Sequence, residues 1–142
     1  MKYHLVILKK PYLDAVLDGR KKIESRFART RIPAYEQVRC GDTLYLKQSS
    51  GPVVAVATAV QVNYLTDLTP PRMLELKQRY NGQICGDDYY WQDKMDSRFG
   101  LLVWLADVRP ITPIRIAKKD WRAWVVLQPG SDYDLLRLAQ CK

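Results

Sequence analysis

The amino-acid sequence predicts an α+β fold: a small mixed, mainly antiparallel β-barrel with short flanking helices. Short apolar runs typical of strands recur along the chain, and two segments typical of short helices interrupt them. The length of 142 residues suits one domain, so we predict a single domain over residues 1–142. Hydrophobic residues make up 47% of the chain and are spread over its whole length, which allows a packed core.

The first part of the chain predicts a strand, a short helix and a second strand. Residues 3–9 are rich in Leu, Val and Ile, as in a buried strand. Pro11 suits the first turn of a helix, and Gly19 suits the position just after its last turn. The next strand is predicted at residues 22–28. Its alternation places two sets of side chains on opposite faces: Ile23, Ser25 and Phe27, and Lys22, Glu24 and Arg26.

The middle of the chain predicts a hairpin. Residues 43–48 alternate, with Leu44 and Leu46 directed inward. A Ser-Ser-Gly-Pro turn then leads into residues 53–62, a long run of small and branched apolar side chains. The two runs and the turn between them are typical of an antiparallel pair.

The second half predicts a helix, a loop and a strand. A Thr-Pro pair predicts the start of a helix that runs to about Tyr80, where an Asn-Gly pair closes it. Residues 83–98 are polar with aromatic interruptions, and we predict a long loop or lid there. A buried strand follows at residues 99–108, with an extension over residues 111–116 after a break at Pro110.

Residues 118–142 are predicted to be a C-terminal extension of uncertain structure. Within it, Trp121, Trp124 and Val125 are expected to pack, and residues 133–138 to form a helical turn or two. Because no long linker precedes the extension, we assign it to the same domain.

Cysteine, histidine and hydropathy patterns argue against several classes of protein. The three cysteines are odd in number and far apart, and His4 is the only histidine, so we predict no metal site and no cofactor. No apolar run approaches the ~18 residues of a membrane helix. The N-terminus opens directly into a strand-like run without the pattern of a signal peptide. We therefore expect a cytoplasmic protein without membrane contact, and assume a monomer.

The charge of the chain favours a polyanionic partner. Lysine and arginine number 23 against 15 acidic residues, which gives a net charge of +8. An excess of this size is typical of proteins that bind RNA, DNA or nucleotide phosphates. The alternative is a protein that is basic without having such a partner.

One short motif carries a family resemblance. Residues 19–26 have the sequence Gly-Arg-Lys-Lys-Ile-Glu-Ser-Arg, which fits G-x-K-x-x-E-x-R between the predicted helix and strand. This segment resembles the signature of the ASCH family (activating signal cointegrator homology), whose members are relatives of the RNA-binding PUA domains. The resemblance extends over the first 62 residues and, more loosely, over residues 101–113. Residues 83–98 and 118–142 have no counterpart in it.

The resemblance implies a PUA-like β-barrel with a cleft lined by the motif, and it implies a choice of activities. Most family members are regarded as RNA-binding. Small bacterial members act as amidohydrolases on N4-acetylated cytidine, using a lysine, a threonine and a glutamate, and ribonuclease activity has also been proposed in the family. Lys21 matches the lysine of the hydrolases, but Glu24 stands at the threonine position, and the glutamate has no clear match.

The motif also has a physical interpretation of its own. Glu24 and Arg26 are two residues apart on a strand, so they share one face about 7 Å apart. Lys21, in the turn before them, is expected to point into the same cleft. A carboxylate accepts hydrogen bonds from an exocyclic amine of a base, and a guanidinium binds phosphate. The alternative is a salt bridge on the barrel wall without a ligand.

We therefore predict a basic cleft that binds RNA or a nucleotide, and a catalytic role for Lys21 and Glu24 if the chain is an enzyme. Exposed arginines would extend the basic surface for phosphates, and consecutive aromatic residues would stack on a base. The predicted ligand-binding residues are Tyr12, Gly19, Lys21, Glu24, Arg26, Arg29, Arg31, Tyr89 and Trp91. A third hypothesis is a basic adaptor that binds only protein.

Overall fold

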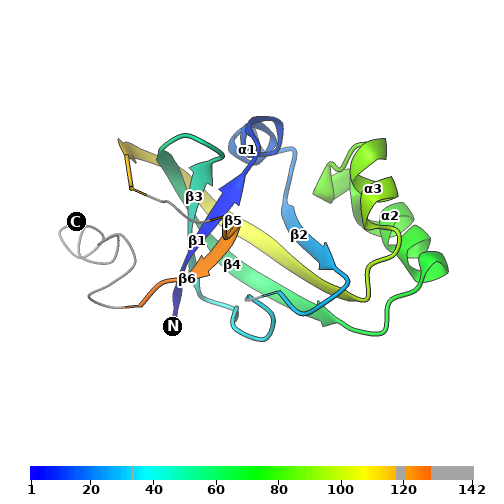
Figure 1. The fold of residues 1–142 in the computed structure, drawn as a ribbon. Helices are drawn as coiled ribbons and strands as arrows, with labels where there is room; N and C mark the ends of the chain where they lie inside the picture. The colour runs from blue at the N-terminus through cyan, green and yellow to red at the C-terminus, as the bar shows by residue number, and fades with distance from the viewer. Residues whose placement is uncertain (33, 118–120, 129–142) are drawn as a thin grey trace.

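A computed structural model describes residues 1–32, 34–117 and 121–128 of the chain. Six strands form one curled sheet in the order β2-β5-β4-β3-β1-β6, and three helices flank it (Figure 1). The strands are β1 (Tyr3–Leu8), β2 (Ile23–Ala28), β3 (Thr43–Gln48), β4 (Val53–Leu65), β5 (Phe99–Ile114) and β6 (Trp124–Val126). Only β1 and β3 pair in parallel; the other neighbours are antiparallel. The predicted α+β, mainly antiparallel architecture is confirmed, as a half-barrel.

Helix α1 (Lys10–Leu17) packs on the main core of the sheet. Ala55, Ala57 and Ala59 alternate along β4 toward this core, and Leu13 and Val16 of α1 belong to the same buried cluster. Small side chains on β4 leave room for a helix to pack closely on the sheet. Leu44 and Leu46 of β3 are also buried in this cluster, as predicted.

Helices α2 (Pro70–Ile84) and α3 (Asp88–Lys94) form a second layer beyond β2, away from α1 (Figure 1). Ile23 and Phe27 of β2 are buried in an apolar cluster with residues of these two helices. Glu24 and Arg26 lie on the other face of the strand, so the predicted alternation of β2 is confirmed. Strand β2 therefore separates the two helical regions.

The prediction of a loop over residues 83–98 is wrong. Helix α2 runs through its Asn-Gly pair to Ile84 and ends at Cys85, which has a left-handed backbone with φ 62°. Helix α3 then begins after Asp87, whose carboxylate accepts a hydrogen bond from the backbone N–H of Tyr90. Burial of Ile84 and Trp91, each 1% exposed, stabilises both helices against β2.

Strand β5 continues through Pro110, where a break was predicted. Strand β2 pairs with β5 only as far as Trp104, so that edge of β5 has no further strand partner among the described residues. On its other edge, β5 pairs with β4 through a series of register shifts, and Pro110 lies opposite Ala55. Proline has no N–H to donate to a neighbouring strand. It is tolerated in β5 because one edge of the strand is open here and the pairing on the other edge is irregular.

The C-terminal region matches its prediction in part. Trp124 and Val125 are buried in β6, which pairs with β1, but Trp121 is 99% exposed and its predicted packing is wrong. The helical turn predicted at residues 133–138 lies outside the described residues. Within the described part of the chain, no helix is long and apolar enough to cross a membrane.

Candidate ligand-binding cleft

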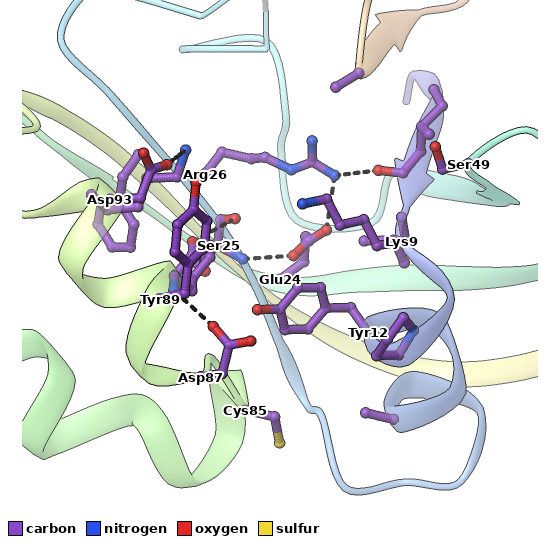
Figure 2. A pocket seen from close by; sticks show the side chains of 18 of the residues that line it. Lys9, Tyr12, Glu24, Ser25, Arg26, Ser49, Cys85, Asp87, Tyr89 and Asp93 are labelled. Carbon is purple, nitrogen blue, oxygen red and sulfur yellow. Dashed lines mark hydrogen bonds and ion pairs between the residues drawn. The ribbon is translucent and has the colours of Figure 1, made fainter.

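A cleft of about 790 Å³ lies between α1 and α3, and residues of β2 form its floor (Figure 2). The end of β1 and the turn between β3 and β4 close it at one side. The polar and aromatic residues that line it are Lys9, Tyr12, Asp14, Arg20, Glu24, Ser25, Arg26, Phe27, Ser49, Cys85, Asp87, Tyr89, Tyr90, Asp93 and Lys94. The cleft therefore draws on segments spread from Ile7 to Ala123.

Arg26 and Glu24 form the polar centre of the floor. Nη2 of Arg26 donates to Oε2 of Glu24 and to the backbone carbonyl of Ile7, both at 2.9 Å. The ring of Trp124 lies 5.5 Å from the guanidinium carbon, in a cation–π arrangement. No partner is found for Nε and Nη1 of Arg26 in the described part of the structure, and the side chain is 19% exposed. The guanidinium is thus held in place while one edge stays open.

Lys21 is buried beside Glu24 and Tyr12 and is not one of the residues that line the cleft. Its Nζ atom donates to the backbone carbonyls of Ile23 and Ile84, both at 2.8 Å, and lies 3.4 Å from Oε1 of Glu24. The residue is 3% exposed. Because Ile84 is the last residue of α2, the ammonium satisfies a free carbonyl and the negative dipole end of that helix. The prediction that Lys21 points into the cleft is therefore wrong; Glu24 and Arg26 do line it.

Glu24 is an ionised anchor at neutral pH. Burial raises the pKa of its carboxyl, but the charges of Arg26 and Lys21 outweigh burial and hold the pKa below its usual range. The backbone N–H of Ser25 donates to Oε1 at 3.0 Å. With all these donors in place, the carboxylate is a weak proton acceptor and orients its basic neighbours.

Tyrosines form much of the two side walls. Tyr12 of α1 faces Tyr90 of α3 edge-on at 6.0 Å between ring centroids. The hydroxyls of Tyr90 and Ser25 are hydrogen bonded at 2.6 Å, and burial raises the pKa of the Tyr90 phenol well above its usual range. Tyr89 is 71% exposed and lines the cleft, as predicted for an aromatic residue that contacts a ligand.

Besides Lys21, four of the predicted ligand-binding residues lie outside the cleft lining. The indole of Trp91 is 1% exposed and donates to Oδ1 of Asn81, so the stacking role predicted for it is wrong. Gly19 ends α1 with φ 87° and has a backbone role. Arg29 pairs with Asp96, and Arg31 lies over aromatic rings. Both arginines remain exposed, so their predicted contacts with phosphates stay a prediction.

The cleft is not uniformly basic, in contrast to the prediction. Its acidic lining residues are Asp14, Glu24, Asp87 and Asp93, and its basic ones are Lys9, Arg20, Arg26 and Lys94. The net charge of +8 is therefore carried mostly by other parts of the chain. Among the residues with described positions, no group of three metal-binding side chains was found.

The prediction missed several lining residues. Lys9 and Ser49 come from the ends of β1 and β3, which meet only because these strands pair in parallel with Leu8 opposite Gln48. Asp87 is the N-cap of α3, and an aspartate is one of the residue types that favour the start of a helix. That signal was present in the sequence, whereas nothing local indicated Lys9 or Ser49.

Comparisons with known proteins agree with this fold. The ASCH domain family matches residues 6–129. The ASCH protein of Zymomonas mobilis has a crystal structure with a TM-score of 0.74 and 16% sequence identity, over 98% of this chain and 94% of that chain. Two of its single-residue variants give TM-scores of 0.74 and 0.72, each at 16% identity, covering 99% of this chain and 98% and 96% of theirs.

At this identity the likeness to solved structures shows the fold alone. A search of the curated proteins found no match. The family match, in contrast, spans most of the sequence and includes the motif over residues 19–26. The chain therefore belongs to the ASCH domain family.

Proposed function

We propose that this protein binds RNA, with a single nucleotide unit in the cleft between α1 and α3. The observation that carries the proposal is the combination of size and lining. About 790 Å³ lies in the range of small-molecule sites, roughly 300–1,000 Å³. Tyr12 and Tyr89 offer aromatic surface to a base, while Arg26 offers hydrogen-bond donors on the floor.

The charge of the whole chain supports a polyanionic ligand. The net charge of +8 would attract an RNA strand, and exposed Arg29 and Arg31 would contact its phosphates beyond the cleft. Binding is therefore expected to weaken as salt rises, because each phosphate contact releases bound counterions.

Catalysis as an amidohydrolase or a ribonuclease has less support from the geometry. An amine that acts as a base or nucleophile needs a free lone pair and access to the substrate. Nζ of Lys21 is instead surrounded by two carbonyls and a carboxylate, and the residue is 3% exposed. Glu24 is occupied by three donors. This arrangement fits structural support of a binding site better than chemistry.

Titration of a labelled short single-stranded RNA by fluorescence anisotropy tests the proposal. Tyr89→Ala is expected to weaken binding about tenfold, because base stacking on an aromatic side chain contributes roughly 1–3 kcal/mol. Trp121→Ala is the matched control, since this aromatic residue is 99% exposed and does not line the cleft. Equal effects of the two changes, or no binding by the unmodified protein, would refute the proposal.

A further inference from the structure

Three consecutive residues at the end of β1 bring three hydrogen-bond donors to one end of the cleft. The carbonyl of Ile7 accepts from Arg26 at 2.9 Å, and the carbonyl of Leu8 accepts from the backbone N–H of Ser49 at 2.8 Å. Lys9 follows directly and lines the cleft. Figure 2 shows Lys9, Arg26 and Ser49 on the same side of the site, across from Asp87.

The donors at this end are free to bind a ligand. No side-chain partner is found for Lys9 in the described part of the chain, and it is exposed. Arg26 is fixed by Ile7, Glu24 and Trp124 but leaves Nε and Nη1 open. A guanidinium held in place with an open edge binds an oxyanion without losing much side-chain entropy.

The charges of the cleft are separated along its length. Arg26 and the buried Lys21 pair with the carboxylate of Glu24, and Lys9 lines the β1 end of the cleft, which leaves an excess of positive charge there. The carboxylates of Asp87 and Asp93 lie on the α3 side with the exposed ring of Tyr89, and Lys94 of the same helix pairs with Asp93 at 3.3 Å (Figure 2). An anionic group is thus favoured at one end, and an aromatic group with amine donors at the other.

We propose that Lys9, Arg26 and Ser49 form a phosphate subsite, and that the cleft recognises a nucleotide by its phosphate as well as by its base. This inference rests on the proposed function and adds that the phosphate lies at the β1 end of the cleft. A terminal phosphate of a mononucleotide and an internal phosphate of RNA share the required chemistry. The base then lies toward Tyr89 and the α3 carboxylates.

Calorimetric titration with the four ribonucleosides, their 5′-monophosphates and matching dinucleotides tests the subsite. The monophosphates are expected to bind about tenfold more tightly than the nucleosides, because charge-assisted hydrogen bonds to phosphate are among the strong ones. Lys9→Ala should remove most of this difference. Lys10→Ala is the matched control, because Lys10 is a neighbouring exposed lysine that pairs with Asp14 and does not line the cleft.

The outcomes separate this inference from the proposed function. If nucleosides bind as tightly as monophosphates, the phosphate subsite is wrong while the cleft remains a nucleoside site. If Lys9→Ala and Lys10→Ala act equally, the effect is one of general charge and the subsite is also wrong. If no nucleoside, nucleotide or RNA binds, both proposals fail. Dinucleotides that bind more tightly than monophosphates would assign the subsite to an internal phosphate of RNA.

Discussion

Two buried polar networks meet at Trp124, one near the start of β1 and one near its end, and they differ in one respect. Near the cleft, Lys21, Glu24 and Arg26 form a network with one open edge on Arg26. Near the start of β1, Nε2 of His4 donates to Asp42 at 2.8 Å, and Nε1 of Trp124 donates to Nδ1 of His4 at 3.1 Å. Trp124 as a donor requires that Nδ1 be unprotonated, so the proton lies on Nε2.

The network of His4, Asp42 and Trp124 leaves no donor or acceptor available to a ligand. Asp42 also accepts from the backbone N–H groups of Lys2 and Arg39, so its carboxylate is fully occupied, and His4 is 0% exposed. It resembles an acid–histidine pair of a catalytic site, yet the ring has no free nitrogen and no access to solvent. The comparison teaches that a buried charged cluster becomes a candidate site only where a donor or acceptor remains available to a ligand.

Replacing Lys21 gives the largest expected effect. Lys21→Met leaves the carbonyls of Ile23 and Ile84 without their donor and removes one partner of Glu24. We expect the free energy of unfolding to fall by about 3–5 kcal/mol, as for a broken buried ion pair. Urea unfolding followed by circular dichroism measures it. Lys22→Met is the control, because Lys22 is exposed, and it should change stability by less than about 0.5 kcal/mol.

The same residue tests the hydrolase alternative. We expect no hydrolysis of N4-acetylcytidine by the unmodified protein, because Lys21 is occupied and lies outside the cleft lining. Turnover that is robust in the unmodified protein and lost in Lys21→Arg would contradict this expectation. It would show that Lys21 leaves its carbonyl partners when substrate binds.

Replacing Asp42 gives a smaller effect on stability alone. In Asp42→Asn, the amide can accept from only part of the donor set, so one buried N–H loses its partner. The expected loss is about 2 kcal/mol in the free energy of unfolding. Asp67→Asn is the control, because Asp67 is exposed and its left-handed φ of 55° suits asparagine. If folded Asp42→Asn protein lost RNA affinity, the His4–Asp42 network would contribute to binding and not to stability alone, which would contradict the comparison.

The pH dependence of stability gives the smallest and most specific test. Burial lowers the pKa of His4 below its ordinary value of 6.5, although Asp42 opposes this shift. The unfolded chain therefore takes up a proton before the folded protein does. Stability is full above pH 6.5 and falls as the pH drops below it, by at most about 1.4 kcal/mol per pH unit.

The pH range in which stability falls identifies His4 as the group responsible. His4 is the only histidine. The pKa values of Glu24 and Asp42 are lowered from 4.5 and 3.8, so these carboxylates lose their contribution only at lower pH. Urea unfolding at a series of pH values between 6.5 and 5 should show the slope. A flat profile in that range would mean that His4 accepts a proton without leaving its network.

The sequence predicted the strands well because alternation is a local property. Leu44 and Leu46 of β3, and Ile23 and Phe27 of β2, are buried as their spacing indicated. Helix α3 was missed because its seven residues are too short to show a helical period and are mostly polar. Its stability comes from Trp91, whose burial against Phe27 is a long-range contact.

The site was predicted only where neighbouring residues form it. Glu24 and Arg26 share a strand, so their common face followed from their spacing. Lys21 was misplaced because its partner Ile84 is 63 residues away and belongs to a helix whose end was predicted too early. Lys9 and Ser49 meet through the parallel pairing of β1 and β3, which no local pattern indicates.

Trp124 belongs to both networks, since it donates to His4 and lies over Arg26. A proton on Nδ1 of His4 would face the N–H of the indole, and the repulsion would displace the ring of Trp124 that lies over the guanidinium. Thermodynamic linkage makes such an effect reciprocal. A ligand that requires Arg26 in its present position must resist protonation of His4, so its binding would shift acid unfolding to lower pH. Titration of His4, near the start of β1, would therefore report occupancy of the cleft near its end.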